Sequence, residues 1–139
     1  MSVVVRLFEP ADHAAAFALW RQTPGLRLGV ADTHEAVMRY LLRNPGMSFV
    51  ALHDKHLVGT VLCGHDGRHG QMHHLVVHPS QRRRGLARQL VRLAVAGLRE
   101  QGIDKCQLLV PRENLKSRAY WLRSGADERS GLMVYTLSL

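Results

Sequence analysis

Two adjacent histidines, His73 and His74, lie in a short apolar run that continues through Val76 and Val77. A neutral imidazole can accept a proton from an amine near physiological pH, so either histidine is a candidate general base. The β-branched residues predict a strand, and Pro79 ends it because proline has no amide hydrogen to donate. Since successive strand residues face opposite sides of a sheet, we expect only one of the two imidazoles to face a substrate.

A basic loop with a glycine follows this strand. Three consecutive arginines precede Gly85, and from Leu86 onward apolar residues recur at the spacing of one helix face. The members of this face are Leu86, Leu90, Leu93, Ala94, Gly97 and Leu98. The unpaired amides at the start of a helix attract anions, and guanidinium groups beside them strengthen that attraction. The order of strand, basic loop and helix therefore predicts an anion-binding site.

The residues before this stretch predict two helices and three further strands. One helix starts at His13, and a second starts after Thr33, a typical N-cap residue. The second helix is expected to bury Val37, Met38, Leu41 and Leu42. Strands are predicted at residues 3–8, 48–52 and 57–63, with polar turns at 53–56 and 64–70.

The residues after the long helix predict a strand at 105–110, a short helix at 114–124 and a last strand at 132–137. A helix between the histidine strand and the strand at 105–110 implies that these two strands are parallel. We therefore expect one domain, residues 1–139, of the α/β (α+β) class, with a mixed and mostly antiparallel sheet of about six strands.

Composition narrows the classes of function. The chain has 139 residues, of which 46% are hydrophobic, so it can bury one proper core. Cys63 and Cys106 lie in apolar runs and are interpreted as core residues, not as a disulfide or a metal pair. No signal peptide and no apolar segment near the ~18 residues of a membrane span is visible, which predicts a cytoplasmic protein without a membrane partner.

The net charge of +8 is compatible with nucleic acid, an anionic surface or a polyanionic cofactor. Arginine is dense between Arg82 and Arg99, which favours a local anion site. No helix-turn-helix, zinc finger or aromatic stacking array is visible, and only 6% of residues are aromatic, so a nucleic-acid-binding domain is the weaker interpretation. The nine histidines lack the spacing of a zinc site, and no metal is expected.

Two motifs and the order of elements resemble one known family. The segment Arg82-x-x-Gly85-x-Ala87 is similar to the Gln/Arg-x-x-Gly-x-Gly/Ala loop of the GNAT superfamily of N-acetyltransferases. About 30 residues later, Asn114-x-x-Ser117-x-x-Tyr120-Trp121-x-x-x-Gly125-Ala126 resembles the family's Asn-x-x-Ala-x-x-Phe-Tyr-x-x-x-Gly-Phe segment. The turn from Gly64 to Gly70 resembles that of small bacterial members.

The resemblance implies the fold and the acetyl donor. It implies a GNAT fold over nearly the whole chain, in the order strand, two helices, three strands, helix, strand, helix, strand. It also implies that acetyl-CoA is the donor, with its pantetheine arm on the main chain of the histidine strand and its pyrophosphate on the basic loop. The implied binding residues are Leu75, Val76, Val77, Arg82, Arg83, Arg84, Gly85, Leu86, Ala87, Arg88, Asn114 and Trp121.

The same resemblance implies His73 as general base, with His74, Asp66 or a water molecule left as alternatives. Asp66 followed by glycine is first of all a turn former. The chain departs from the family pattern at Arg83, where glycine is frequent, and at Trp121, where many members have a tyrosine proposed as general acid. That general acid is therefore in doubt.

The implied reaction is acetyl transfer to an amine by direct attack in a ternary complex. A non-catalytic module that binds acyl-CoA is the alternative, if base and acid have been lost. The acceptor stays open among a protein N-terminus, a lysine, a polyamine, an amino acid and a drug. A monomer and a homodimer also both stay open.

Overall fold

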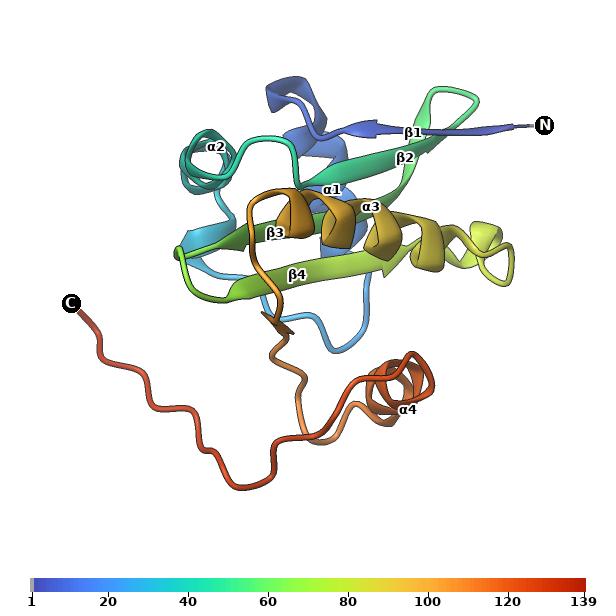
Figure 1. Cartoon of the computed structure of the whole chain (residues 1–139). Coiled ribbons are helices and arrows are strands. Elements are labelled where there is room, and N and C mark those ends of the chain that lie inside the picture. The colour runs from blue at the N-terminus through green and yellow to red at the C-terminus, as the bar shows by residue number, and fades with distance from the viewer. Residues whose placement is uncertain (1) are drawn as a thin grey trace. The chain divides into compact units, whose positions relative to one another are not determined.

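A computed structural model describes residues 2–139 (Figure 1). The first compact unit ends at Leu109, and the second comprises Val110–Leu139. Within the described residues, the sheet has five strands in the order β1-β2-β3-β4-β5. The strands are β1 (Val3–Leu7), β2 (Phe49–His53), β3 (His56–His65), β4 (Gly70–Val77) and β5 (Cys106–Gln107). The first four pair antiparallel and β5 pairs parallel to β4, so the predicted mixed, mostly antiparallel sheet is confirmed.

Helices cover both faces of this sheet. The helices are α1 (His13–Arg21), α2 (His34–Arg43), α3 (Leu86–Glu100) and, in the second unit, α4 (Leu115–Arg123). Trp20 of α1 donates from Nε1 to Thr60 Oγ1 of β3 at 2.9 Å, whereas a Cβ on Gly59 would lie 3.4 Å from Leu90 Cδ1 of α3. Because successive strand residues face opposite sides, α1 and α3 pack on opposite faces. In Figure 1, α3 crosses the sheet on the side nearer the viewer.

The two helical faces bury different parts of the predicted pattern. On α3 the predicted apolar face packs inward, because its members Leu86, Leu90, Ala94 and Leu98 are all buried. On the other face, Trp20 and Val37 are buried in a cluster with strand residues Val50, Leu62 and Val76. This cluster fixes α1 and α2 over the centre of the sheet.

Local signals explain where the helices begin. Thr33 accepts a hydrogen bond from the Ala36 amide at 3.2 Å, which confirms it as the N-cap of α2. Pro10–Asp12 and Val30–Asp32 form short 3₁₀ turns, η1 and η2, before α1 and α2, and Pro79–Gln81 forms a third, η3, after β4.

Three sequence-based expectations are wrong in detail. Leu42 does not join the buried face of α2, since 84% of its surface is exposed. The strand predicted at 105–110 contains only Cys106–Gln107. Residues 132–137 form no strand, and Tyr135 is 89% exposed. An apolar run forms a strand only where it pairs with a neighbouring strand, and residues 132–137 pair with none among the described residues.

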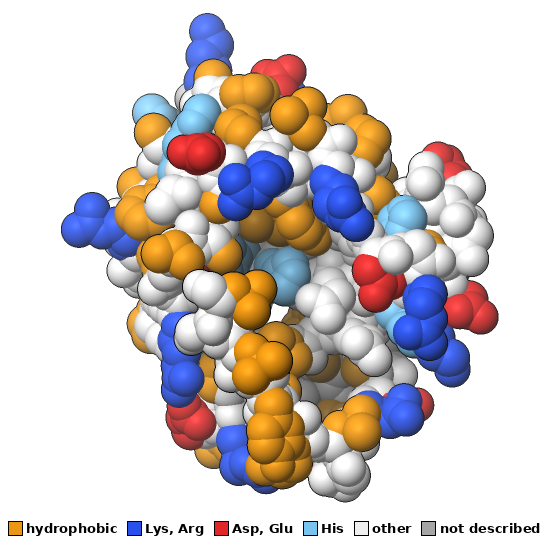
Figure 2. Space-filling view, turned by 90° about the vertical axis from the view of Figure 1, so that its left-hand side faces the viewer, with side chains coloured by type: hydrophobic (Ala, Val, Ile, Leu, Met, Phe, Trp, Pro, Cys, Tyr) orange, Lys and Arg blue, Asp and Glu red, His pale blue; other side chains and the backbone are white. Residues whose placement is uncertain are grey.

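Charge and hydropathy are distributed without a membrane-type segment. No helix among residues 2–139 has the length and apolar character that crossing a bilayer requires. On the face drawn in Figure 2, the Lys and Arg side chains are separated by hydrophobic and uncharged groups and form no continuous basic patch.

Candidate active site

A β-bulge in β4 lies at the two histidines. Leu62 of β3 is opposite His73 and Thr60 is opposite Val76, so two residues of β4, His74 and Leu75, face the single residue Val61. His74 has a positive φ of 48°, a conformation that is unusual for a residue with a side chain. The bulge breaks the alternation of side chains along β4.

Because of this bulge, both imidazoles lie on the side of α1 and α2. The His73 ring centroid is 6.0 Å from that of Tyr40 in α2, and the His74 ring is 4.6 Å from that of Trp20 in α1. The two imidazole centroids are 6.5 Å apart. The expectation that the two histidines face opposite sides of the sheet is therefore wrong, because it assumed regular strand geometry.

His74 is held by an acidic partner from η2. Its Nε2 lies 2.6 Å from Asp32 Oδ1, and its backbone carbonyl accepts a hydrogen bond from Thr60 Oγ1 at 2.8 Å. Asp32 is buried, its Oδ2 accepts from the Gly29 amide at 2.9 Å, and its carbonyl lies 2.8 Å from His13 Nε2. A carboxylate cannot donate, so an ionised Asp32 requires the hydrogen on His74 Nε2.

His73 is suited to accept a proton at neutral pH. Burial lowers the pKa of the His73 imidazole, the neighbouring His74 lowers it further, and the carboxylate of Asp32 opposes both. The imidazole is consequently neutral near pH 7, which is the form a base needs. The nearby Tyr40 hydroxyl is buried without a hydrogen-bond partner among the described residues, and burial raises the pKa of this phenol.

One side of β4 is open beside the bulge. β5 pairs only with Gly70 and Gln71, and no other strand among residues 2–139 pairs with β4 on that side. Main-chain groups at Leu75 can therefore meet an extended ligand as a further strand would. The main chain of Val76 faces β3 instead, because Val76 is opposite Thr60 and the His78 amide, two residues later, donates to the Val58 carbonyl of β3 at 2.7 Å. The Val77 carbonyl is already engaged, since Arg82 Nε donates to it at 3.1 Å.

The basic loop leads from β4 into the start of α3. Gly85 is the N-cap of α3 with φ of 75°, and no side chain caps the helix. The amides of Leu86, Ala87 and Arg88 have no intrahelical acceptor in the first turn. The Leu86 side chain is buried, so only its backbone can contact a ligand. Arg84 donates to Gln81 Oε1 at 3.3 Å, whereas Arg83 and Arg88 are exposed.

Comparison with known proteins identifies the family. The model of the Acetyltransferase (GNAT) family matches residues 12–126. An acetyltransferase of Photorhabdus laumondii is 34% identical over 110 residues, which are 79% of this chain and 76% of that protein. One of Pectobacterium atrosepticum is 33% identical, over 79% of this chain and 77% of its own length. The chain belongs to the GNAT family of acetyltransferases.

Solved structures share the GNAT fold at low identity. Ard1 of Thermoplasma volcanium has a TM-score of 0.78 at 17% identity, covering 90% of this chain and 82% of that one. The structure of AAC(6')-Iy in complex with the bisubstrate analog CoA-S-monomethyl-acetylneamine has a TM-score of 0.76 at 21% identity and covers all of both chains. At such identity the likeness shows the fold alone.

The second GNAT motif lies in the second compact unit. Asn114 accepts a hydrogen bond from the Ser117 amide at 3.2 Å and so caps α4. The rings of Tyr120 and Trp121 have centroids 5.1 Å apart and planes at 83°. A role for Asn114 and Trp121 in binding acetyl-CoA stays a prediction.

Several other residues are placed away from the bulge. Asp66 Oδ1 accepts from the Arg68 and His69 amides at 2.8 and 2.9 Å, as a turn former does. Cys63 and Cys106 are free thiols, and the contact with Cys106 raises the pKa of Cys63, followed by its burial. Within residues 2–139, no three His, Cys, Asp or Glu side chains are arranged to hold a metal ion.

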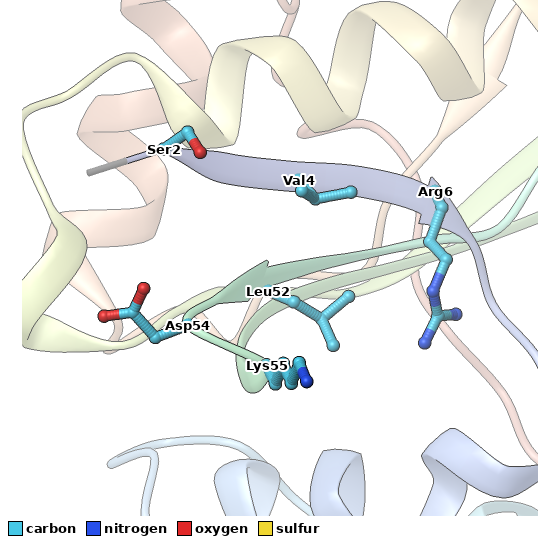
Figure 3. A pocket seen from close by; sticks show the side chains of 6 residues that line it. All are labelled: Ser2, Val4, Arg6, Leu52, Asp54 and Lys55. Atoms are coloured by element: carbon cyan, nitrogen blue, oxygen red, sulfur yellow. The ribbon is translucent and has the colours of Figure 1, made fainter.

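A depression of about 370 Å³ at the β1 edge is lined by Ser2, Val4, Arg6, Leu52, Asp54 and Lys55 (Figure 3).

Three residues around the β4 bulge escaped the sequence analysis. Asp32 directly precedes the N-cap Thr33, and Tyr40 and Trp20 fall within the predicted helices. Their proximity to β4 depends on how η2, α1 and α2 pack on the sheet. Spacing along the chain carries no signal for such contacts.

Proposed function

We propose that this chain is an N-acetyltransferase that transfers the acetyl group of acetyl-CoA to a primary amine. The observation that carries the proposal is the side of β4 left unpaired beyond Gln71, which includes the histidine bulge and is followed along the chain by the uncapped start of α3. Family membership supports acyl transfer, and the open strand offers a place for a donor that is both extended and anionic.

The chain's residues fit acetyl-CoA in two parts. The amides of the first turn of α3 and the exposed guanidinium groups of Arg83 and Arg88 would bind the pyrophosphate. Main-chain groups at Leu75 would bind the pantetheine arm and polarise the thioester carbonyl.

The proposed chemistry is a direct displacement. The neutral imidazole of His73 accepts a proton from the ammonium form of the acceptor, directly or through water, and frees the amine lone pair. A carbon–nitrogen bond then forms as the carbon–sulfur bond breaks, the sulfur leaves as a thiolate, and the attacking nitrogen loses its second proton to that thiolate or to water. The pKa of a thiol is about 8.5, so this leaving group needs little help from a general acid. The absence of a tyrosine at Trp121 is therefore compatible with turnover.

The test is amine-dependent release of CoA thiol. Wild-type protein is incubated with acetyl-CoA and a panel that contains N-terminal peptides, lysine peptides, polyamines, amino acids and amine drugs. Thiol release that depends on one class, with acetylated product seen by mass spectrometry, supports the proposal and names the acceptor. Calorimetric binding of acetyl-CoA with no transfer to any class would favour a non-catalytic acyl-CoA module.

A further inference from the structure

The pair formed by Asp32 and His74 is more than a surface contact. Both side chains are largely buried, with exposed fractions of 12% and 13%, and the nitrogen–oxygen distance is 2.6 Å. It joins the segment between α1 and α2 to the bulge of β4, 42 residues later in the chain. A short, sheltered bond between an ionisable donor and acceptor is stronger than a neutral one.

The bulge requires such a restraint. A positive φ at a residue with a side chain costs roughly 1–3 kcal/mol and persists only where its surroundings enforce it. Three contacts enforce it at His74: Asp32 at Nε2, Thr60 at the backbone carbonyl, and the Trp20 ring against the imidazole. Trp20 also donates to Thr60, so these contacts form one connected network.

The network ends at the reacting part of the proposed site. Leu75, whose main chain would meet the thioester, is the second bulge residue, and His73 precedes the first. A shift of His74 would therefore move both the main chain at Leu75 and the imidazole of His73. Misplacement by about 1 Å can cost roughly 10²-fold in rate.

We propose that Asp32 and His74 form a positioning pair that holds the β4 bulge, and with it the main chain at Leu75 and the imidazole of His73, in the geometry that acyl transfer requires. This inference rests on the proposed function. Asp32 holds the hydrogen on His74 Nε2 and ties the imidazole to η2, and neither residue touches the reacting atoms.

The chain offers a close control for Asp32. Asp12 and Asp32 are each the last residue of a 3₁₀ turn, and each is 8% exposed when the whole residue, backbone included, is counted. Each accepts from the amide three residues earlier, at 2.8 and 2.9 Å respectively. They differ in the remaining partner, which is Arg6 for Asp12 and His74 for Asp32.

The variant Asp32→Asn separates the two acceptor bonds. Asp32 accepts from Gly29 and His74 on different oxygens, but an asparagine has only one oxygen. If that oxygen still accepts from the Gly29 backbone amide, the side-chain NH2 group of the asparagine faces His74 Nε2. An NH2 group can only donate, so His74 can no longer carry its hydrogen on Nε2. We expect calorimetry with acetyl-CoA to show binding weakened at least about tenfold in Asp32→Asn and changed less than about twofold in Asp12→Asn.

Nitrogen-15 NMR of the wild-type imidazoles provides a second measurement. The pair requires a protonated Nε2 in His74, in the neutral or the charged ring. A pyridine-type Nε2 signal for His74 would overturn the inference whatever the binding data show. Should Asp32→Asn fail to fold, His74→Asn takes its place, because asparagine adopts the left-handed conformation readily and is too short to keep the same contact. We expect the same loss of acetyl-CoA affinity in His74→Asn.

The outcomes distinguish this inference from the proposed function. Failure of the wild type to bind acetyl-CoA would overturn the proposed function and the role given to the pair. Wild-type affinity in Asp32→Asn or in His74→Asn would overturn the pair's role and leave the acetyltransferase proposal standing.

Discussion

At the scale of single residues, the environment of His73 decides whether it can act as a base. Burial and His74 lower the pKa of its imidazole, so the group is neutral at pH 7 but is a weaker base than a free histidine. That is an acceptable compromise where the amine is held close and the base takes only the first of the two protons that the nitrogen loses.

We expect His73→Gln to lower kcat by roughly 10²-fold at pH 7, because general-base roles typically contribute 10² to 10⁴. The loss should shrink at high pH, where the amine is already deprotonated. Steady-state kinetics with the acceptor found in the panel provide the measurement, and His56→Gln, an exposed histidine at the β2–β3 turn, is the control. A large loss in His56→Gln, or none in His73→Gln, would contradict the assignment.

The same pKa shift predicts a dependence of stability on pH. The folded state disfavours protonated His73, so the unfolded chain binds more protons once the pH falls below the unfolded pKa of about 6.5. The free energy of unfolding should therefore decrease as pH falls through this value, and the loss should stop below the folded pKa. Denaturant unfolding from pH 8 to pH 5 should show a steeper decline in wild type than in His73→Gln. Parallel curves would show that His73 is not held neutral.

Local sequence patterns place His73 on a strand but do not reveal its surroundings. The imidazole, the strand and Pro79 follow one another along the chain, so local patterns find them. Asp32 lies far from His74 in sequence, and the bulge that brings both histidines to one side is a feature of pairing between strands. Neither is encoded in residue spacing.

At the scale of elements, the start of α3 combines a left-handed glycine with uncapped amides. Gly85→Glu should abolish detectable acetyl-CoA binding, because a carboxylate would repel phosphate where the helix dipole favours an anion. Gly102→Glu is a matched control at the other end of α3, since both glycines have positive φ, 75° and 79°, and open space where a Cβ would stand. Calorimetry should show near wild-type affinity in Gly102→Glu. Equal losses in the two variants would point to backbone strain in place of charge.

The contact of α2 with β3 requires a glycine at position 64. A Cβ there would lie 2.5 Å from Asn44 Cγ and 2.8 Å from the Tyr40 hydroxyl. Asn44 cannot move freely, since its Oδ1 accepts from the His65 amide at 2.9 Å. We expect Gly64→Ala to lower the free energy of unfolding by about 1–3 kcal/mol. Gly29→Ala, where nothing lies within 4 Å, should change it by less than about 0.5 kcal/mol in the same urea titration. A neutral Gly64→Ala would mean that α2 can retreat from the sheet.

The observed ends of helices and strands show which sequence signals were sufficient to predict them. Thr33, Pro79 and Gly85 mark starts and stops through caps and φ preferences, and the structure places those boundaries where they were expected. The strands at 105–110 and 132–137 were inferred from apolar runs alone, which carry no information about a pairing partner. These are the places where the expected sheet and the observed one differ.

At the scale of the whole molecule, the net charge of +8 attracts any polyanion, so binding alone does not identify the acetyl-CoA site. Long-range attraction between exposed charges is screened over about 8 Å at physiological ionic strength. Amides at a helix start and free strand groups are short-range donors that salt affects less. Salt dependence therefore separates a general basic surface from a shaped site.

We expect acetyl-CoA to raise the melting temperature of the protein. A ligand at 100 times its Kd stabilises the native state by about 2.7 kcal/mol, which corresponds to a shift of roughly 5–15 °C for a chain of this size. The shift should persist in added salt, since much of the binding comes from short-range contacts. Single-stranded DNA at the same charge concentration should give a smaller shift that salt removes. If DNA stabilised the protein at high salt and acetyl-CoA did not, the basic loop would serve a nucleic acid, and the acetyl-donor assignment would be wrong.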